Sequence, residues 1–135
     1  MTRFDPTSSL ATLAGFQRAT VDHVMRRFHD ATNPTRRFLV ADETGLGKSL
    51  VARGVVARTI ERLQDDPSVG RIDIVYVCSN ADIARQNVKR LDVIGQQHEI
   101  ATRLTLVARG ARSLDGEAVA SGKAVNLVSF TPGTL

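Results

Sequence analysis

The residues from Asp42 to Ser49 carry the clearest chemical signal in the sequence. They read Asp-Glu-Thr-Gly-Leu-Gly-Lys-Ser, follow the apolar run 38–41 and precede a helical pattern that begins near Leu50. Glycines in such a loop let backbone N–H groups turn onto phosphate oxygens, and the N-terminus of the following helix adds partial positive charge. The stretch therefore predicts a phosphate-binding loop of the Walker A type between a strand and a helix.

The side chains of this loop can be given separate roles. Lys48 would reach the β- and γ-phosphates and is the predicted catalytic residue. Ser49 would ligate Mg²⁺. The predicted cofactors are ATP and Mg²⁺, and the predicted loop contacts come from Thr44, Gly45, Leu46, Gly47, Lys48 and Ser49. Asp42 stands where the usual pattern G-x-x-x-x-G-K-[ST] has its first glycine. A plain glycine turn with an incidental lysine is the alternative interpretation.

Composition and charge narrow the class of protein. The chain has 135 residues, of which 42% are hydrophobic and 24% charged, so we expect one folded domain or a part of one. All but three of its 18 basic residues are arginine, which suits partners rich in phosphate, although acidic residues are interspersed. Cys78 is the single cysteine and excludes an intramolecular disulfide. Without an apolar stretch of about 18 residues or a secretory signal, we expect a cytoplasmic protein that makes no membrane contact.

Hydrophobic periodicity predicts the elements that position the loop. Strands alternate with helices, which implies parallel strands and an α/β sheet. Gly54 and Ala57 would keep the helix after the loop thin for close packing on that sheet. The expected elements are an arm at 1–15 with one helical turn, helices at 16–30, 50–63 and 81–94, strands at 37–41, 72–78 and 124–130, and a weaker strand pattern at 104–107.

The acidic form of the loop resembles motif I of superfamily 2 helicases and DNA translocases, in the chromatin-remodeller-like and DEAD/DEAH-like branches. In the chromatin-remodeller-like branch, which the loop resembles most, an acidic pair stands where other P-loops have the first glycine, as Asp42 and Glu43 do here. Phe16-Gln17 is similar to the aromatic–glutamine pair that the family places upstream of motif I. The resemblance implies that the amide of Gln17 contacts adenine, because an amide can donate and accept in one plane. A simple surface position for Gln17 is the alternative.

Two later segments resemble the family's nucleic-acid contacts. Cys78 to Gln86 is similar to motif Ia, although Ser79-Asn80 stands where DEAD-box proteins have Pro-Thr, so only these two residues are carried over. Thr131-Pro-Gly is similar to motif Ib and adds Thr131 and Gly133. The resemblance implies that Ser79, Asn80, Thr131 and Gly133 contact a nucleic-acid backbone. Helix capping is the alternative role for Ser79-Asn80.

Together these similarities imply that residues 16–135 form the N-terminal portion of a RecA-like helicase ATP-binding domain, with a mainly parallel sheet flanked by helices. The family's Walker B pair, which holds Mg²⁺ and orients the attacking water, would lie beyond Leu135, so we expect nucleotide binding without appreciable hydrolysis. The expected partners are nucleic acid, with DNA favoured over RNA, and a missing C-terminal helicase portion or a second copy of the chain. A stand-alone nucleotide-binding regulatory module and a non-helicase P-loop ATPase are the alternatives.

Overall fold

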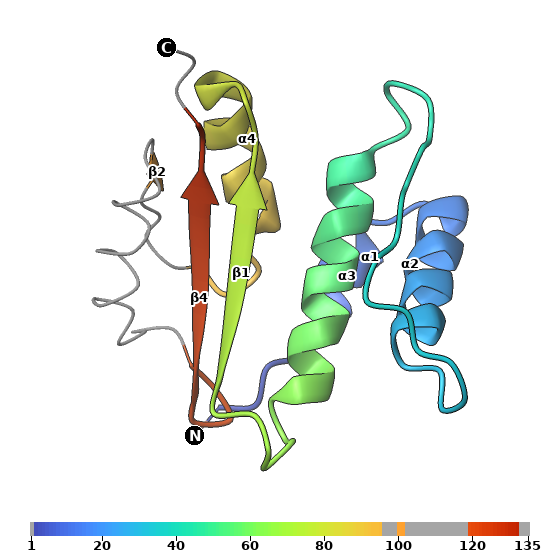
Figure 1. The fold of residues 1–135 in the computed structure, drawn as a ribbon, viewed down its shortest axis with the longest axis vertical. Helices are drawn as coiled ribbons and strands as arrows, with labels where there is room; N and C mark the ends of the chain where they lie inside the picture. The colour runs from blue at the N-terminus through green and yellow to red at the C-terminus, as the bar shows by residue number, and fades with distance from the viewer. Residues whose placement is uncertain (1, 96–99, 102–118, 133–135) are drawn as a thin grey trace.

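The computed structural model describes residues 2–95, 100–101 and 119–132. The fold is mixed α/β, as predicted, and Figure 1 shows α3 lying between α2 and the paired strands β1 and β4. The elements are α1 (Thr7–Ala11), α2 (Gly15–Phe28), α3 (Lys48–Leu63), β1 (Arg71–Val77), α4 (Ala81–Leu91), β2 (Ile100–Ala101), β3 (Val119–Ala120) and β4 (Lys123–Phe130).

The sheet is built on one parallel pair. β1 and β4 run side by side from Arg71 opposite Ala124 to Val77 opposite Phe130, which confirms the predicted parallel arrangement of these strands. β4 lies between β1 and the short β2, and the two-residue strand β3 pairs antiparallel with the start of β4. Ser121 and Gly122 join β3 to β4 with φ values of 49° and 84°. Two consecutive positive φ angles are typical of a tight hairpin turn whose twist matches the strands.

The strand predicted at 37–41 is wrong, because this segment forms no strand. It runs on the α2 side of α3, away from β1, so within the described part of the chain no strand lies beside it to complete its ladder of hydrogen bonds (Figure 1). The ring of Phe38 instead meets His23 of α2 edge-on at 5.5 Å, and Val40 packs in the α2–α3 cluster. Leu39 is left 83% exposed. β propensity alone does not make a strand, because the backbone also needs a partner.

α3 buries two opposite faces. Ile60 packs with Ile72 and Val125 of the sheet, whereas Val51 packs with Val21 of α2. α4 covers the same sheet face farther along, where Val88 and Leu91 meet Leu127. The helix–sheet contacts therefore rest on one face of β1 and β4.

The prediction that Gly54 thins α3 toward the sheet is wrong. A Cβ atom at Gly54 would lie 2.7 Å from Val21 Cγ2 and 3.0 Å from Leu13 Cδ1, so the missing side chain admits α2 and the segment before it. Real Cβ atoms do not approach other carbons this closely. The thin face of α3 is thus its helix-packing face.

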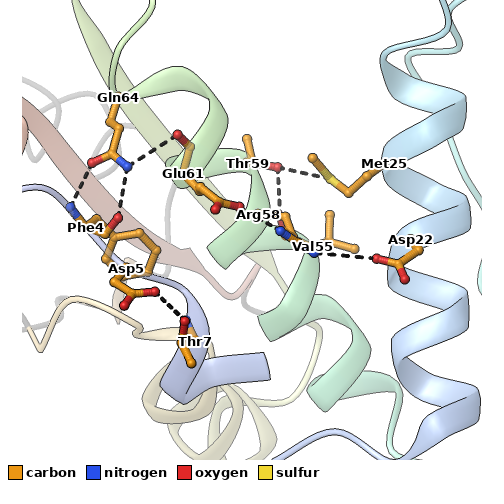
Figure 2. Close-up of polar contacts among 10 residues, drawn as sticks. All are labelled: Phe4, Asp5, Thr7, Asp22, Met25, Val55, Arg58, Thr59, Glu61 and Gln64. Atoms are coloured by element: carbon orange, nitrogen blue, oxygen red, sulfur yellow. Dashed lines mark hydrogen bonds and ion pairs between the residues drawn. The ribbon is translucent and has the colours of Figure 1, made fainter. Parts of the chain in front are cut away.

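The C-terminal end of α3 is held by Gln64, whose side chain is only 1% exposed. Its Oε1 accepts from the N–H of Phe4 at 2.8 Å, and its Nε2 donates to the carbonyl oxygens of Phe4 at 2.9 Å and Glu61 at 3.3 Å (Figure 2). Ser121 Oγ also donates to Oε1 at 3.2 Å. One amide thus joins the N-terminal arm, α3 and the β3–β4 turn.

Other predicted boundaries need small corrections. The helix predicted at 81–94 ends at Leu91, because Asp92 turns extended and its Oδ1 accepts the N–H groups of Ile94 and Gly95. The predicted helical turn in the arm is confirmed by α1. The predicted strand at 104–107 and the site residue Gly133 lie outside the described residues. Among the described helices, none is both long and apolar enough to cross a membrane.

Candidate phosphate-binding site

The loop before α3 depends on two glycines. Gly45 has a φ of +92°, and Gly47, the N-cap of α3, has a φ of +78°. Side chains rarely adopt this left-handed region, so both positions favour glycine. Among the described residues, Ser121 is the one non-glycine with a positive φ, so Asp42 takes an ordinary backbone conformation. The loop therefore keeps its glycines where the backbone requires them and tolerates an acidic residue where it does not.

Lys48, the first residue of α3, folds back over the loop. Its Nζ donates to the carbonyl oxygens of Asp42 at 2.8 Å and Glu43 at 3.2 Å. The first N–H groups of a helix have no carbonyl one turn earlier to bind, and α3 has no side-chain cap. The ammonium group, the amides of Lys48 and Ser49 and the Ser49 hydroxyl thus share one end of the helix. The ammonium group and the two amides are donors of the kind that bind a phosphate group, and the Ser49 hydroxyl oxygen is a ligand of the type that Mg²⁺ prefers.

Gln17 reaches the loop from α2. Its Nε2 donates to the carbonyl oxygen of Leu46 at 3.0 Å, and its Oε1 accepts from the N–H of Ala14 at 2.9 Å. The residue is 7% exposed, so the alternative of a surface position is wrong. A Cβ atom on Gly47 would lie 2.4 Å from Gln17 Nε2, which gives a second reason for glycine there. The adenine contact stays a prediction, for which the amide has one N–H and one lone pair beyond these bonds.

Asn87 is a site residue that the sequence did not reveal. Ser49 Oγ donates to Asn87 Oδ1 at 3.1 Å, and Asn87 Nδ2 donates to the hydroxyl of Tyr76 at 2.9 Å. The bonds link α3, α4 and β1. Burial raises the pKa of the Tyr76 hydroxyl above its usual value. A polar residue within the apolar stripe of a helix was the available signal, because Asn87 lies between the buried Ala84 and Leu91.

Three of the four predicted nucleic-acid residues, Ser79, Asn80 and Thr131, lie at the carboxyl ends of β1 and β4. Asn80 Oδ1 accepts from the N–H groups of Asp82 at 2.9 Å and Ile83 at 3.1 Å, so the capping alternative is confirmed for this residue. Ser79 is exposed beside it. Thr131 is buried, and within the described part of the chain its hydroxyl oxygen has no hydrogen-bond partner. The N–H of Cys78 donates to the carbonyl of Phe130 at 3.1 Å, which brings the two strand ends together.

The loop and these strand ends lie at the same end of the fold. In Figure 1 the N-terminus of α3 and the arrowheads of β1 and β4 all lie in the upper part of the view. Arg53 of α3 also donates to the carbonyl of Arg90 in α4 at 2.8 Å, which holds the two helices together near the loop. Predicted site residues from distant parts of the sequence therefore share one end of the fold. Comparisons with protein families, curated proteins and solved structures found no match to this chain.

Proposed function

We propose that the chain binds ATP·Mg²⁺ at Asp42–Ser49 and is the ATP-binding portion of an ATP-dependent nucleic-acid helicase or translocase. The observation that carries the proposal is the loop geometry: two glycines in the left-handed region lead into the uncapped N-terminus of α3, and the ammonium of Lys48 folds over them. The resemblance to motif I supplies the helicase part of the proposal.

Lys48 changes partners when phosphate binds. Its Nζ donates to two loop carbonyls in the structure, and these neutral acceptors would be exchanged for charged phosphate oxygens. The ammonium donor is charged in both states, but an anionic phosphate oxygen adds Coulomb attraction that a neutral carbonyl oxygen lacks, so the exchange favours the bound state. Mg²⁺ bound beside Ser49 would neutralise phosphate charge.

The test is ATP binding measured by calorimetry in magnesium buffer. Lys48→Ala removes the ammonium, and we expect a loss of about 10- to 100-fold in affinity, since a charged hydrogen bond contributes about 1.5–3 kcal/mol and 1.4 kcal/mol is tenfold. Lys89→Ala, at an exposed position of α4, removes the same charge away from the loop and is the matched control. Equal affinities of the Lys48→Ala and Lys89→Ala variants would overturn the proposal.

ATP hydrolysis is tested separately from ATP binding. We expect the 135 residues to bind ATP without appreciable turnover, because their single Asp-Glu pair, Asp42-Glu43, lies in the loop itself and the family uses another such pair to activate water. Phosphate release that persists through purification and disappears in Lys48→Ala would contradict this expectation.

The nucleic-acid part of the proposal rests on the edge formed by Ser79 and the start of α4. Contacts to a phosphate backbone make affinity fall steeply as salt rises. We therefore expect binding of single-stranded DNA that weakens between low and physiological salt, with RNA as the comparison. ATP binding without any salt-dependent nucleic-acid binding would instead support a nucleotide-binding module of another kind.

A further inference from the structure

Asn87 occupies a position where the pattern of α4 calls for an apolar residue. The buried residues Ala84, Val88 and Leu91 define the face of α4 that packs on the sheet, and Asn87 lies on this face, half-buried. A polar amide withdrawn from water destabilises the fold unless it finds partners. Its two partners come from other elements, Ser49 of α3 and Tyr76 of β1.

The bond to Asn87 fixes the direction of the Ser49 hydroxyl. A serine hydroxyl has one proton and two lone pairs, and here the proton points to Asn87 Oδ1. The lone pairs therefore point away from Asn87 and stay free for a cation. Without this acceptor the hydroxyl could rotate and direct its proton toward the cation.

Tyr76 fixes the orientation of the amide in turn. Asn87 Nδ2 donates to the Tyr76 hydroxyl, so the opposite end of the amide, Oδ1, faces Ser49. The Arg53–Arg90 hydrogen bond holds α4 against α3 one turn beyond each of the paired residues. The position of Asn87 Oδ1 is thus set by the packing of α3, α4 and β1 rather than by the loop itself.

We propose that Asn87 is a positioning residue that orients Ser49 as a ligand of Mg²⁺, an inference that rests on the proposed binding of ATP·Mg²⁺. Groups that orient a metal ligand through its remaining hydrogen bond typically contribute 10- to 100-fold to metal affinity. Asn87 contacts no phosphate in this scheme. Its loss should therefore reduce the gain in ATP affinity that Mg²⁺ provides and leave ATP affinity without Mg²⁺ unchanged.

The experiment compares ATP affinity in excess magnesium chloride with ATP affinity in EDTA for each variant. Asn87→Leu removes the acceptor at similar volume, and we expect the magnesium-dependent gain in affinity to fall about tenfold while affinity in EDTA stays unchanged. Asn87→Asp keeps an acceptor for the Ser49 proton and retains the gain. Gln86→Leu makes the same change of side chain at the adjacent exposed position of α4 and serves as the control.

A spectroscopic readout is also available because Tyr76 is the single tyrosine and the chain has no tryptophan. Inorganic tripolyphosphate does not absorb where tyrosine does, so tyrosine emission can be followed as magnesium tripolyphosphate is added. We expect the emission to change in the wild type and Gln86→Leu, and to stay constant in Asn87→Leu.

The outcomes are distinguishable. If the wild type binds ATP with a magnesium-dependent gain and Asn87→Leu keeps that gain, the role of Asn87 is wrong and the phosphate site stands. If the wild type binds ATP in neither buffer, the proposed function itself fails and this inference fails with it. If Asn87→Leu does not fold, Tyr76→Phe decides, because it releases the amide while keeping Asn87: an undiminished gain overturns the proposal and a reduced gain supports it.

Discussion

The two ends of α3 are built in opposite ways. At the N-terminal end a glycine loop leads into the helix without a side-chain cap, and the first turn contains no acidic residue. At the C-terminal end Lys123 Nζ donates to the carbonyl oxygens of Leu63 at 3.2 Å and Gln64 at 2.6 Å, and Arg62 lies in the last turn. The helix dipole is compensated by the protein at one end and left uncompensated at the other.

α4 differs from α1, α2 and α3, none of which has a capping hydrogen bond to its N-cap side chain. Its N-cap Asn80 accepts two backbone N–H groups, and Asp82 lies in its first turn. Asn80 thereby satisfies two of the first N–H groups of α4, whereas those of α3 have no side-chain cap. Under the proposed function, the loop end of α3 serves binding and the Gln64 end serves stability, which the following changes test.

The largest expected effect is on the stability end. Gln64→Leu leaves the N–H and carbonyl of Phe4 and the Ser121 hydroxyl without their partner, and each unsatisfied buried group costs about 1–3 kcal/mol. We expect the free energy of unfolding in urea to fall by about 3 kcal/mol while ATP affinity is unchanged. Gln86→Leu, at an exposed position, should change stability by less than about 0.5 kcal/mol. A large loss of ATP affinity in folded Gln64→Leu would show that the C-terminal end of α3 also serves binding.

A smaller effect on stability and a clear one on binding are expected at the loop. Gly47→Ala forces a side chain into the left-handed region, at about 1–2 kcal/mol, and displaces the amide of Gln17. We expect a modest loss in urea unfolding together with a loss of ATP affinity. Gly70→Ala is the control, since a Cβ there meets open space. Unchanged ATP affinity in Gly47→Ala would show that the glycine conformation serves the fold alone.

The smallest expected effect is a pH dependence at the stability end. Burial, and then the charge of Arg62, lower the pKa of His29 below its usual 6.5. The unfolded chain therefore binds the proton more readily, so the stability present above pH 6.5 is lost as pH falls through the lower folded pKa. Urea unfolding between pH 7.5 and 5.5 should show a drop that is reduced in His29→Gln. An equal drop in both proteins would show that His29 does not cause the pH dependence of stability.

Local residue patterns were enough to predict two strands and one helix. The strands 72–78 and 124–130 and the helix after the loop were predicted within two residues, because alternation and helical periodicity are properties of neighbouring residues. The segment 37–41 failed for the opposite reason. Its apolar residues suit a strand, but a strand needs a partner, and in this fold α3 separates the segment from β1.

Some residues of the candidate site could likewise be predicted from local sequence, and others could not. The loop glycines, Lys48 and Ser49 could be read from the sequence because they are contiguous and each type has a fixed role toward phosphate. Gln17 could be placed near the loop through the resemblance, although its bond to Leu46 could not. Asn87 and Gln64 were missed because their partners lie far away along the chain, as Ser49 does from Asn87 and Phe4 from Gln64.

The sequence by itself determined the glycine loop, the helix that follows it and the parallel strand pair. Tertiary structure alone decided which end of α3 is left open, because Gln64, Lys123 and the N-terminal arm meet only after the chain has folded. It also decided that the Ser49 hydroxyl faces Asn87. Such contacts depend on the packing of several elements, and no local pattern of residue types specifies which distant side chains will meet.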